Sequence, residues 1–369
     1  MTMSYAVRSD GAGAPLSAPT ALWVIPVSEY AGVGRHVLDV ARHGIPGWRL
    51  VFLCPPGELA NLLTAAGAAV LTAAVDPGSG IARAAHEIRR VVQSLRPRIV
   101  HSHLAFADLC LTLAIPGMPV AVVTTEHGIA GDDLVYHGSA WRSRLRALAH
   151  AGRLRRADAL IAVSASTAEV VRRKWHPGAG VRIEVIPNGI DPVPHSRARH
   201  PGLHIVSLAR LAPEKGLDHL VRAFAVLAAG EPSARLTLAG TGPLASEMTR
   251  LVSRLGLAER VRLPGFVPAD EVLATGDVLA QLSRWENCSY SLLDAQTHGL
   301  GVVATAVGGN PELLPAQCLV PATDHSAVAR RLREQGLDPG VRPTLPVSWP
   351  TIDDMCARIA DLYREVTVR

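Results

Sequence analysis

The stretch WENCSYSLLDA, residues 285–295, joins a predicted strand to a predicted helix. The apolar run 278–282 precedes it, and the helix is expected to begin near Ser289. Two carboxylates, Glu286 and Asp294, stand on either side of the helix start, where backbone N–H groups have no intrahelical partner. This arrangement can hold hydroxyl groups on both sides of a phosphate. Alternatively, the two acids are a charge at a helix N-terminus and a solvated helix residue.

The same alternation of short apolar runs and amphipathic stretches continues through the chain, as is typical of parallel α/β layers. Predicted strands of a first series occupy residues 21–27, 49–53, 99–101, 120–124, 159–163 and 182–186, with helices at 34–42 and 81–95. Strands of a second series occupy residues 204–208, 235–239, 261–263, 278–282 and 302–305. The pattern predicts two doubly wound, Rossmann-like domains that face each other across a cleft, with ligands bound beyond the carboxyl ends of the strands.

The domain boundaries follow from composition. Residues 1–20 are rich in Ser, Gly, Ala and Pro and are expected to form a disordered tail. The N-terminal domain should span residues 21–192, and the Pro- and Arg-rich segment 193–202 should link it to a C-terminal domain at 203–345. A last amphipathic helix is expected within residues 346–369.

Composition excludes several classes of protein. The 369 residues are 48% hydrophobic and 19% charged, which excludes disorder for most of the chain. The longest apolar stretch, residues 109–123, contains two prolines and falls short of the ~20 residues that a membrane span needs. The five cysteines are scattered and form no C-x-x-C pair, which argues against a disulfide framework and a zinc site. With no signal-peptide pattern, the expected location is the cytoplasm.

Two loops carry groups suited to a diphosphate. Gly32-Val33-Gly34 lies at a helix start, where backbone N–H groups attract an anion, although a tight turn explains these glycines equally well. Arg210 and Lys215 follow the first strand of the second series and would place two cations at its carboxyl end. Solvated surface cations are the alternative. Only two of the 37 cations are lysines, however, and a lysine kept in such a background favours a functional role for Lys215.

Taken together, these motifs resemble the retaining glycosyltransferases of family 4, which have the GT-B fold of two Rossmann-like domains. The resemblance runs from about residue 21 to the last helix, and its landmarks stand in the family's order. They are the Gly32/Gly34 loop, Val100-His101-Ser102-His103, Thr125-Glu126-His127-Gly128, Val163-Ser164, Pro187-Asn188-Gly189-Ile190-Asp191, Arg210 with Lys215, Gly240-Thr241-Gly242-Pro243, Glu286 with Asp294, and Gly308-Gly309-Asn310-Pro311-Glu312.

The resemblance implies a role for each matching residue. His127 would lie over the donor sugar, Arg210 and Lys215 would neutralise the departing diphosphate, and Glu286 would hold sugar hydroxyls. Further contacts with the donor are expected. The Gly32 amide would meet the distal phosphate, and the amides near Cys288 and Ser289 would hold the sugar and phosphate. Asp294 would bind the ribose, the backbone at Gly265 and Val267 would meet the base, and the strand end at Gly242 would also lie against the donor. The final helix would cross back onto the first domain.

The acceptor side is expected in the first domain, at His103, Glu126, Tyr136 and His137. Since His101 and His103 alternate at a strand end, only one of them should face the cleft, and no third ligand for a metal is evident. No Asp-x-Asp pair stands at a plausible metal position, so catalysis is expected to need neither metal nor cofactor. Glu126 is a conceivable nucleophile, but same-face substitution without a covalent intermediate is the preferred mechanism.

Some residues depart from the family's pattern. Asp294 stands where the family has a glutamate and is shorter by about 1.5 Å. Gln296, Thr297 and His298 replace a small apolar run, which puts the donor's identity in doubt. Six arginines, at positions 142, 144, 146, 153, 155 and 156, form either a solvated helix face or a surface that docks on anionic lipid, at about 1 kcal/mol per cation. No nucleic-acid motif accompanies them.

The sequence thus predicts a retaining, metal-independent glycosyltransferase that moves a sugar from a nucleoside-diphosphate sugar, in the first instance a UDP-sugar, to a hydroxyl group. The acceptor would be a small molecule, a lipid-linked molecule or a glycan, and the enzyme would work in the cytoplasm or at the inner face of the membrane. The alternatives are a nucleotide-sugar epimerase or a phosphorylase of the same fold, and a protein that binds nucleotide sugar without turnover.

Overall fold

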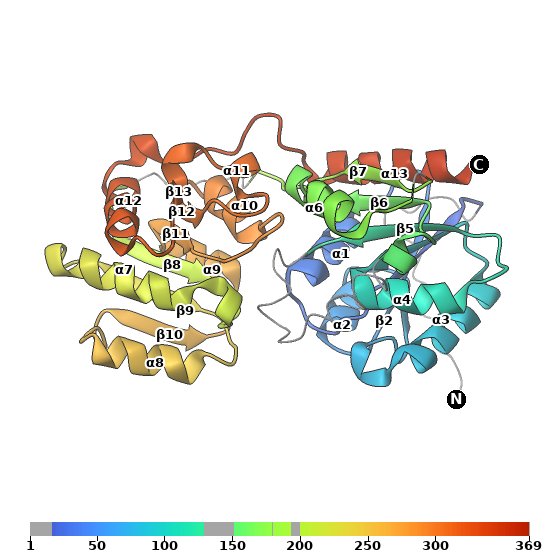
Figure 1. Ribbon diagram of the computed structural model, residues 1–369, viewed down its shortest axis with the longest axis horizontal. Coiled ribbons are helices and arrows are strands. Elements are labelled where there is room, and N and C mark those ends of the chain that lie inside the picture. Colours follow the sequence, from blue (N-terminus) through green and yellow to red (C-terminus); the bar gives the residue numbers. More distant parts are fainter. Residues whose placement is uncertain (1–16, 129–150, 179, 193–199, 369) are drawn as a thin grey trace. The chain divides into compact units, whose positions relative to one another are not determined.

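The computed structural model describes residues 17–128, 151–178, 180–192 and 200–368 (Figure 1). The chain divides into two compact units. The N-terminal unit combines Met1–Gly189 with Pro350–Arg369, and the C-terminal unit is Ile190–Trp349. Each unit is a parallel sheet with helices on its faces, so the predicted pair of Rossmann-like domains is confirmed.

The N-terminal unit contains a seven-stranded parallel sheet in the order β3-β2-β1-β4-β5-β6-β7. The strands are β1 Thr20–Val24, β2 Arg49–Cys54, β3 Val70–Thr72, β4 Ile99–His103, β5 Ala121–Glu126, β6 Ala159–Ala162 and β7 Arg182–Val185. The helices are α1 Gly32–His43, α2 Glu58–Ala65, α3 Ile81–Leu95, α4 Leu104–Ala114, α6 Ala165–Trp175 and α13 Ile352–Thr367. All residues of β1 and β4 are buried, as expected for strands covered on both faces.

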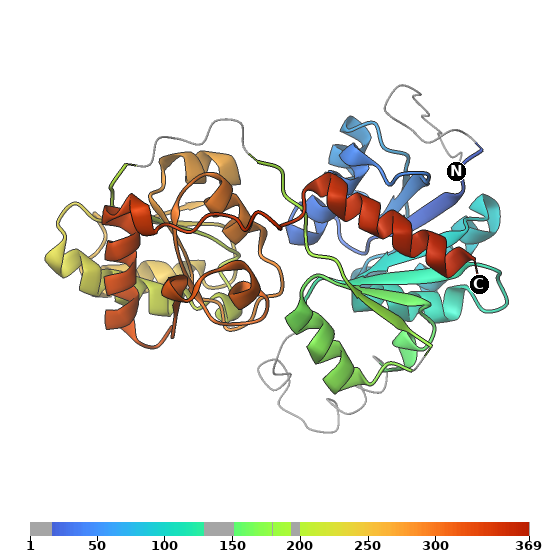
Figure 2. The ribbon, with the colours of Figure 1, turned by 90° about the horizontal axis from the view of Figure 1, so that it is seen from above.

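The last helix, α13, belongs to the N-terminal unit, where it runs close to α1 (Figure 2). A capping box fixes its start, because the Thr351 side chain accepts from the Asp354 amide and the Asp354 carboxylate accepts from the Thr351 amide. Met355, Ile359 and Tyr363 are fully buried in the same core cluster as Trp23 of β1. The end of the chain is therefore part of the core of the first sheet.

The C-terminal unit contains a six-stranded parallel sheet in the order β10-β9-β8-β11-β12-β13. The strands are β8 His204–Leu208, β9 Arg235–Ala239, β10 Val261–Gly265, β11 Val278–Gln281, β12 Gly301–Thr305 and β13 Leu319–Val320. The helices are α7 Leu217–Gly230, α8 Ala245–Arg254, α9 Ala269–Thr275, α10 Tyr290–Thr297, α11 Asn310–Leu313 and α12 His325–Leu337. The turn between β8 and α7 contains the 3-10 helix η3, Pro213–Lys215.

Two details differ from the sequence prediction. β1 begins at Thr20, which is buried, so the last residue of the expected tail is part of the sheet. The edge strands β3 and β13 were not predicted, and they have only three and two residues. Most of the predicted tail, residues 1–16, lies outside the described part of the chain, as does most of the predicted linker.

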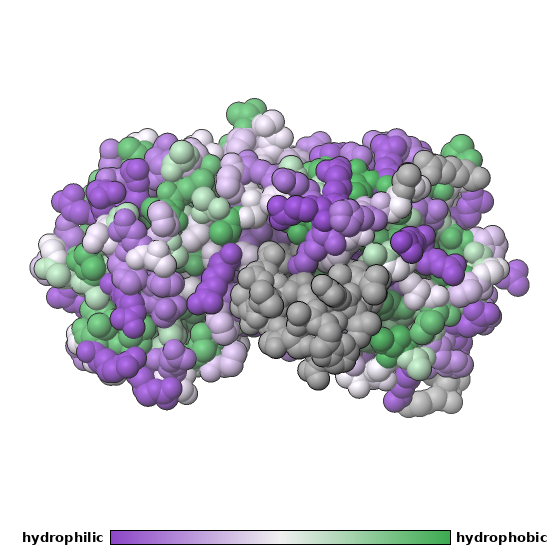
Figure 3. Space-filling model, viewed as in Figure 1, coloured by the Kyte–Doolittle hydropathy of each residue, from purple (hydrophilic) through white to green (hydrophobic). Residues whose placement is uncertain are grey.

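The helices differ in length and polarity. Within the described ranges, no helix is both long enough and apolar enough to cross a bilayer. On the face drawn in Figure 3, hydrophilic residues predominate and apolar residues occur in small separate groups.

Candidate functional site

The loops at the carboxyl ends of β8, β9, β11 and β12 are packed against one another in the C-terminal unit. Gly308, with φ +54°, lies so close to the loop after β11 that a Cβ atom would stand 1.6 Å from the carbonyl oxygen of Glu286. A Cβ atom on Gly240 would stand 2.0 Å from the carbonyl oxygen of Ala209. Only glycine permits these approaches, so the Gly-rich strand ends bring the predicted donor-binding loops together.

Lys215 and Glu286, predicted from separate motifs, form an ion pair. Lys215 ends η3, and Glu286 lies in the loop between β11 and α10. The Ser283 hydroxyl also donates to Glu286 Oε1, at 2.8 Å. The side chains of Lys215 and Glu286 are 22% and 11% exposed, so both remain reachable from solvent.

Arg210 lies in the same loop as Lys215. One of its guanidinium nitrogens donates to Glu214 Oε1 at 2.5 Å, and Glu214 is buried. The Arg210 side chain is nevertheless 68% exposed. The loop after β8 therefore carries two cations, each held at one end by a carboxylate, at the carboxyl edge of the sheet.

The start of α10 is the predicted amide cradle. Ser289 is the residue before the first turn, and its hydroxyl accepts from Gln281 Nε2 at 2.7 Å without capping the helix. Cys288 beside it is half-buried. Asp294 on the same helix is only 6% exposed, which is inconsistent with the alternative of a solvated helix acid.

The remaining donor-side residues lie at neighbouring strand ends. Gly242 follows β9, and a Cβ atom there would stand 2.4 Å from the carbonyl oxygen of Leu211. Gly265 ends β10 and accepts from the Gly240 amide at 2.8 Å, while Val267 packs against the core cluster that contains α10. His298 is half-buried and its ring contacts the Asp294 carbonyl, so it closes the end of α10.

Three histidines gather at the carboxyl edge of the sheet in the N-terminal unit. His103 ends β4, His127 follows β5, and His36 lies in α1 after β1. Because β1, β4 and β5 are neighbours in the sheet, their ends meet at one place. His103 Nδ1 lies 2.8 Å from His127 Nε2, and the ring centroids of His36 and His127 are 4.9 Å apart.

The premise that His101 and His103 point to opposite faces of the strand is wrong, although only His103 joins the histidine cluster at the strand end. Residues two apart on a strand point to the same face, and the two rings stack with 4.6 Å between centroids. His101 is nevertheless fully occupied by hydrogen bonds, at 2.6 Å to the Tyr363 hydroxyl and 2.7 Å to the Thr125 hydroxyl. Since the Trp23 indole donates to the same Tyr363 oxygen at 2.9 Å, the tyrosine hydroxyl donates to His101 Nδ1.

These histidines are neutral at physiological pH. Burial lowers the pKa of His36 to about 4, against the opposing effect of its hydrogen bond to Asn188. Burial also lowers the pKa values of His101, His103 and His127 well below the usual histidine value, and neighbouring histidines add to the effect. Each ring therefore presents a lone pair on one nitrogen and a proton on the other.

Glu126 is buried, and Arg153 donates to it at 2.6 Å and also contacts Asp108. Burial raises the pKa of Glu126, and Arg153 acts in the opposite direction. The interpretation of Arg153 as part of a basic surface is wrong, because its side chain has no exposed area. Arg155 and Arg156 are exposed, whereas Tyr136, His137 and the arginines at 142, 144 and 146 lie outside the described residues.

Gly32 begins α1. Apart from its chain neighbours and the backbone of its own helix, none of the described atoms lies within 4 Å of the place where its Cβ would be. The preceding Ala31 provides no side-chain cap, so the helix start can be approached by a ligand. At the end of β4, the neighbour of β1 in the sheet, Leu104 follows His103 with φ +68°, an uncommon conformation for a residue other than glycine.

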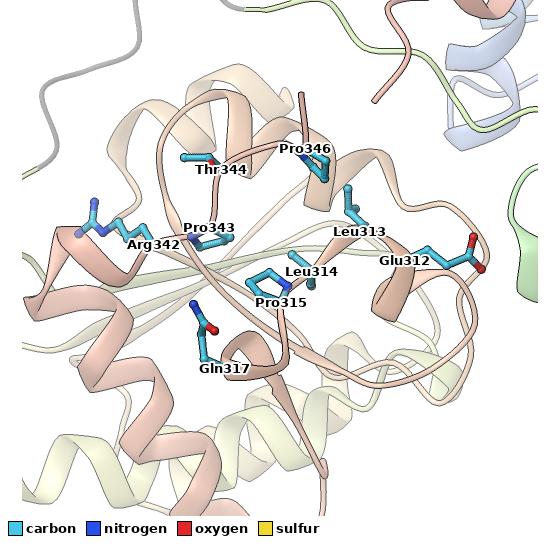
Figure 4. Close-up of a pocket in the computed structure, with 9 residues that line it drawn as sticks. All are labelled: Glu312, Leu313, Leu314, Pro315, Gln317, Arg342, Pro343, Thr344 and Pro346. Atoms are coloured by element: carbon cyan, nitrogen blue, oxygen red, sulfur yellow. The ribbon is translucent and has the colours of Figure 1, made fainter. Parts of the chain in front are cut away.

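A further pocket in the C-terminal unit offers no comparable chemistry. Prolines and leucines make up much of its wall, with Arg342 and Glu312 at opposite ends (Figure 4). The Arg342 guanidinium donates to the backbone carbonyls of His200, Gln335 and Gly336, each at 2.9 Å. The pocket therefore presents no available cation to a diphosphate.

Sequence reasoning assigned no role to His36, Asn188, Tyr363 or Asp108, and it did not pair Glu126 with Arg153. These contacts join residues 27 to 340 positions apart, so no local pattern shows them. For His36 the usable signal was its place four residues after Gly32, on the helix that follows the first strand.

Two family models match consecutive parts of the chain. "Glycosyltransferase Family 4" matches residues 30–193, and "Glycosyl transferases group 1" matches residues 202–335. A phosphatidylinositol N-acetylglucosaminyltransferase subunit of Arabidopsis thaliana is 29% identical over 244 residues, covering 63% of this chain and 53% of the relative. A GDP-mannose-dependent alpha-(1-6)-phosphatidylinositol monomannoside mannosyltransferase of Mycolicibacterium smegmatis is 32% identical over 208 residues, covering 50% of this chain and 54% of the relative.

The chain spans about half the length of these curated relatives. Among solved structures, a sucrose-phosphate synthase from Thermosynechococcus elongatus superposes with a TM-score of 0.77 at 18% identity, covering 95% of this chain and 99% of that one. Anabaena HepE, in complex with UDP and glucose, gives a TM-score of 0.71 at 19% identity, covering 95% and 97%. These neighbours establish the GT-B type of fold. The two family models, which together match residues 30–193 and 202–335, show that the chain belongs to the family 4 glycosyltransferases.

Proposed function

We propose that this protein transfers a sugar from a nucleoside-diphosphate sugar to a hydroxyl group, with retention at the transferred carbon and without a metal. The observation that carries the proposal is the ion pair between Lys215 and Glu286 at a strand edge that also carries Arg210. Family membership supplies the reaction class, and the pair supplies groups for both the diphosphate and the sugar.

The pair suits a donor that carries a diphosphate next to a sugar. When the diphosphate arrives, Lys215 and Arg210 gain a stronger anionic partner, and charge-assisted hydrogen bonds to it replace those to Glu286 and Glu214. The carboxylate of Glu286 is then available to accept from sugar hydroxyls. As the bond to the sugar breaks, negative charge builds on the leaving diphosphate, and the two cations stabilise that charge more than they stabilise the ground state.

The retaining mechanism is proposed as substitution on the same face. Glu126, the conceivable nucleophile, is 3% exposed and bound to Arg153, so it is poorly suited to attack a sugar. This leaves His127 as the group proposed to lie over the sugar. Its neutral imidazole can take part in hydrogen bonds without adding a positive charge beside an oxocarbenium-like transition state.

For the donor we propose a UDP-sugar, in line with the UDP bound in the structurally similar HepE. A GDP-sugar is the alternative, since one relative is named as GDP-mannose-dependent. For the acceptor, the phosphatidylinositol in the names of the relatives favours a lipid-linked hydroxyl, met by the enzyme at the cytoplasmic face of the membrane. None of the five cysteines forms a disulfide with another, which suits that compartment.

The test is a thermal-shift comparison with UDP, GDP and ADP on the wild type and on Lys215→Ala. A nucleotide at 100 times its dissociation constant adds about 2.7 kcal/mol of stability. We expect one nucleotide to raise the melting temperature and Lys215→Ala to abolish that rise. Lys174→Ala, which removes the only other lysine, is the matched control and should respond like the wild type.

The nucleotide that binds then defines the donors for a turnover assay with and without acceptor. Sugar transfer that survives chelator treatment and keeps the anomeric configuration supports the full proposal. No shift with any nucleotide, or sugar release that requires inorganic phosphate in place of an acceptor, would refute it.

A further inference from the structure

The cluster of His36, His103 and His127 has a geometry that sugar transfer does not require. One ring nitrogen from each histidine lies within 4.8 Å of the others. The three side chains come from three different segments of the N-terminal unit, and two of them are buried. Neutral imidazoles brought together in this way are the preferred ligands of zinc and of its neighbours in the first transition row.

One nitrogen that can face the ion is orphaned: His36 Nε2 is buried and has no hydrogen-bond partner among the described residues. His103 Nε2 is also buried without a partner there, but it lies on the side of its ring opposite Nδ1, which is the nitrogen that approaches His127. A buried polar atom without a partner destabilises the fold, so the orphaned His36 nitrogen calls for a ligand that is not part of the chain.

The orientation of His36 is that of a metal ligand. Its Nδ1 lies 3.2 Å from the side-chain oxygen Oδ1 of Asn188, which is itself buried. Because an amide oxygen only accepts, His36 Nδ1 carries the proton and Nε2 carries the lone pair. Metal-bound histidines in proteins donate their other ring N–H to an oxygen in the same way, which fixes the ring and the tautomer.

We propose that His36, His103 and His127 form a three-histidine site for a divalent ion of the zinc type. Zinc binds histidine nitrogen at about 2.0–2.1 Å, and a tetrahedral site therefore needs nitrogens about 3.3 Å apart. The pair His103 Nδ1 and His127 Nε2, at 2.8 Å, opens by about half an ångström when the metal replaces their hydrogen bond. The widest separation, at most 4.8 Å, has to close by up to about 1.5 Å, through rotation of the rings.

The fourth position of such an ion would be open. His36 and His103 are 2% and 0% exposed, whereas His127 is only half-buried. Access is therefore from the side of His127, where water or a ligand oxygen completes the coordination. If the proposed function holds, an ion bound to His127 prevents this imidazole from contacting the donor sugar. The metal is therefore expected to inhibit sugar transfer.

The test uses protein produced without a polyhistidine tag and stripped with a chelator. Zinc is titrated in competition with a chromophoric chelator, and we expect one tight equivalent per chain. His36→Gln and His103→Gln should each weaken binding at least tenfold. The matched control is His219→Gln, which disrupts the histidine pair formed with His325 in the C-terminal unit, at 3.1 Å, and should leave the tight equivalent unchanged.

Two readouts keep the proposal refutable if a histidine variant fails to fold. X-ray absorption of the zinc-loaded wild type should count three imidazoles, and cobalt in place of zinc should give the intense visible bands of a four-coordinate site. Two imidazoles, or tight binding that is retained in His36→Gln, would overturn the proposal. Zinc binding without any nucleotide-induced thermal shift would refute the proposed transfer reaction and support the metal site. A nucleotide-induced thermal shift without zinc binding would support the transfer reaction and refute the metal site.

Discussion

Replacement of Arg153 by Met tests whether a buried charge cluster holds the N-terminal unit together. The Arg153 side chain has no exposed surface and bridges Asp108 and Glu126, whose side chains are 5% and 4% exposed. Its guanidinium carbon also lies 4.8 Å from the ring centroid of Trp175. Methionine retains much of the volume of the side chain, so the variant leaves two carboxylates buried without their cation and changes the packing little.

The expected loss is large. Removing one partner of a buried ion pair costs about 3–5 kcal/mol. Each kcal/mol lowers the melting temperature of a domain of 150–250 residues by roughly 2–4 °C, so Arg153→Met should lower it by about 6–20 °C. Differential scanning calorimetry measures the change directly. Arg155→Met, two positions away and exposed, is the matched control and should stay within about 0.5 kcal/mol of the wild type.

Substitution of the two carboxylates, Asp108 and Glu126, provides a second test. If the cost comes from their uncompensated charge, then adding Asp108→Asn and Glu126→Gln to Arg153→Met should restore part of the lost stability. The reasoning fails if Arg153→Met melts within 2 °C of Arg155→Met, or if the triple variant is less stable than the single one. Either result would show that the buried ion pairs of Arg153 do not account for the stability of this cluster.

Three further predictions concern single contacts. Tyr363→Phe removes the partner of the Trp23 indole and of His101, and should cost about 1–3 kcal/mol in urea unfolding. Tyr30→Phe, at a half-buried tyrosine on the edge of the same core, is the comparison and should cost less. Gly308→Ala places a methyl group 1.6 Å from the Glu286 carbonyl oxygen and should weaken nucleotide binding in calorimetric titration by at least tenfold; unchanged affinity would show that this loop is not part of the donor site. Glu286→Gln releases Lys215 from its ion pair, so nucleotide affinity should stay equal or rise while the transfer rate falls at least a hundredfold; a parallel loss of both would assign Glu286 a purely structural role.

The sheets could be predicted from sequence because buried parallel strands are short apolar runs. The predicted strand 204–208 coincides with β8, and the predicted helix 81–95 coincides with α3. The edge strands could not be predicted in this way, since two or three residues carry no periodicity. Leu319–Val320 is recognisable as a strand only through its pairing with β12.

The site could be predicted only in part. Lys215 and Glu286 were each found from a local motif, but their ion pair depends on the spatial order of β8 and β11, which are neighbours in the sheet and far apart in the sequence. For Arg153 the local pattern was misleading, because residues 142–156 contain six arginines and no acid. The carboxylate partners of Arg153 come from α4 and β5. A cluster of charged residues in a sequence therefore indicates an exposed surface only where no residue of opposite charge from another part of the chain is buried with it.

The alternation of β4 explains why the two buried polar clusters of the N-terminal unit lie on opposite faces of one sheet. His101 and His103 point to the face with Trp23 and Tyr363, whereas Ser102 between them contacts Asp108 on the other face. The neighbouring strand β5 repeats this division, with Thr125 bonded to His101 and with Thr124 and Glu126 in the Asp108–Arg153 cluster.

Hydrogen bonds on both faces therefore fix the ends of β4 and β5, the two strands from which His103 and His127 emerge. A side chain is held within a fraction of an ångström only when its support is itself locked, which is the condition for precise positioning of a reacting group or a metal ligand. Tyr363 makes the last helix part of this support, because its hydroxyl joins Trp23 of β1 to His101 of β4. Destabilising substitutions in α13 should consequently alter the geometry of the histidine cluster while the C-terminal unit stays folded, because the core of that unit contains none of these residues.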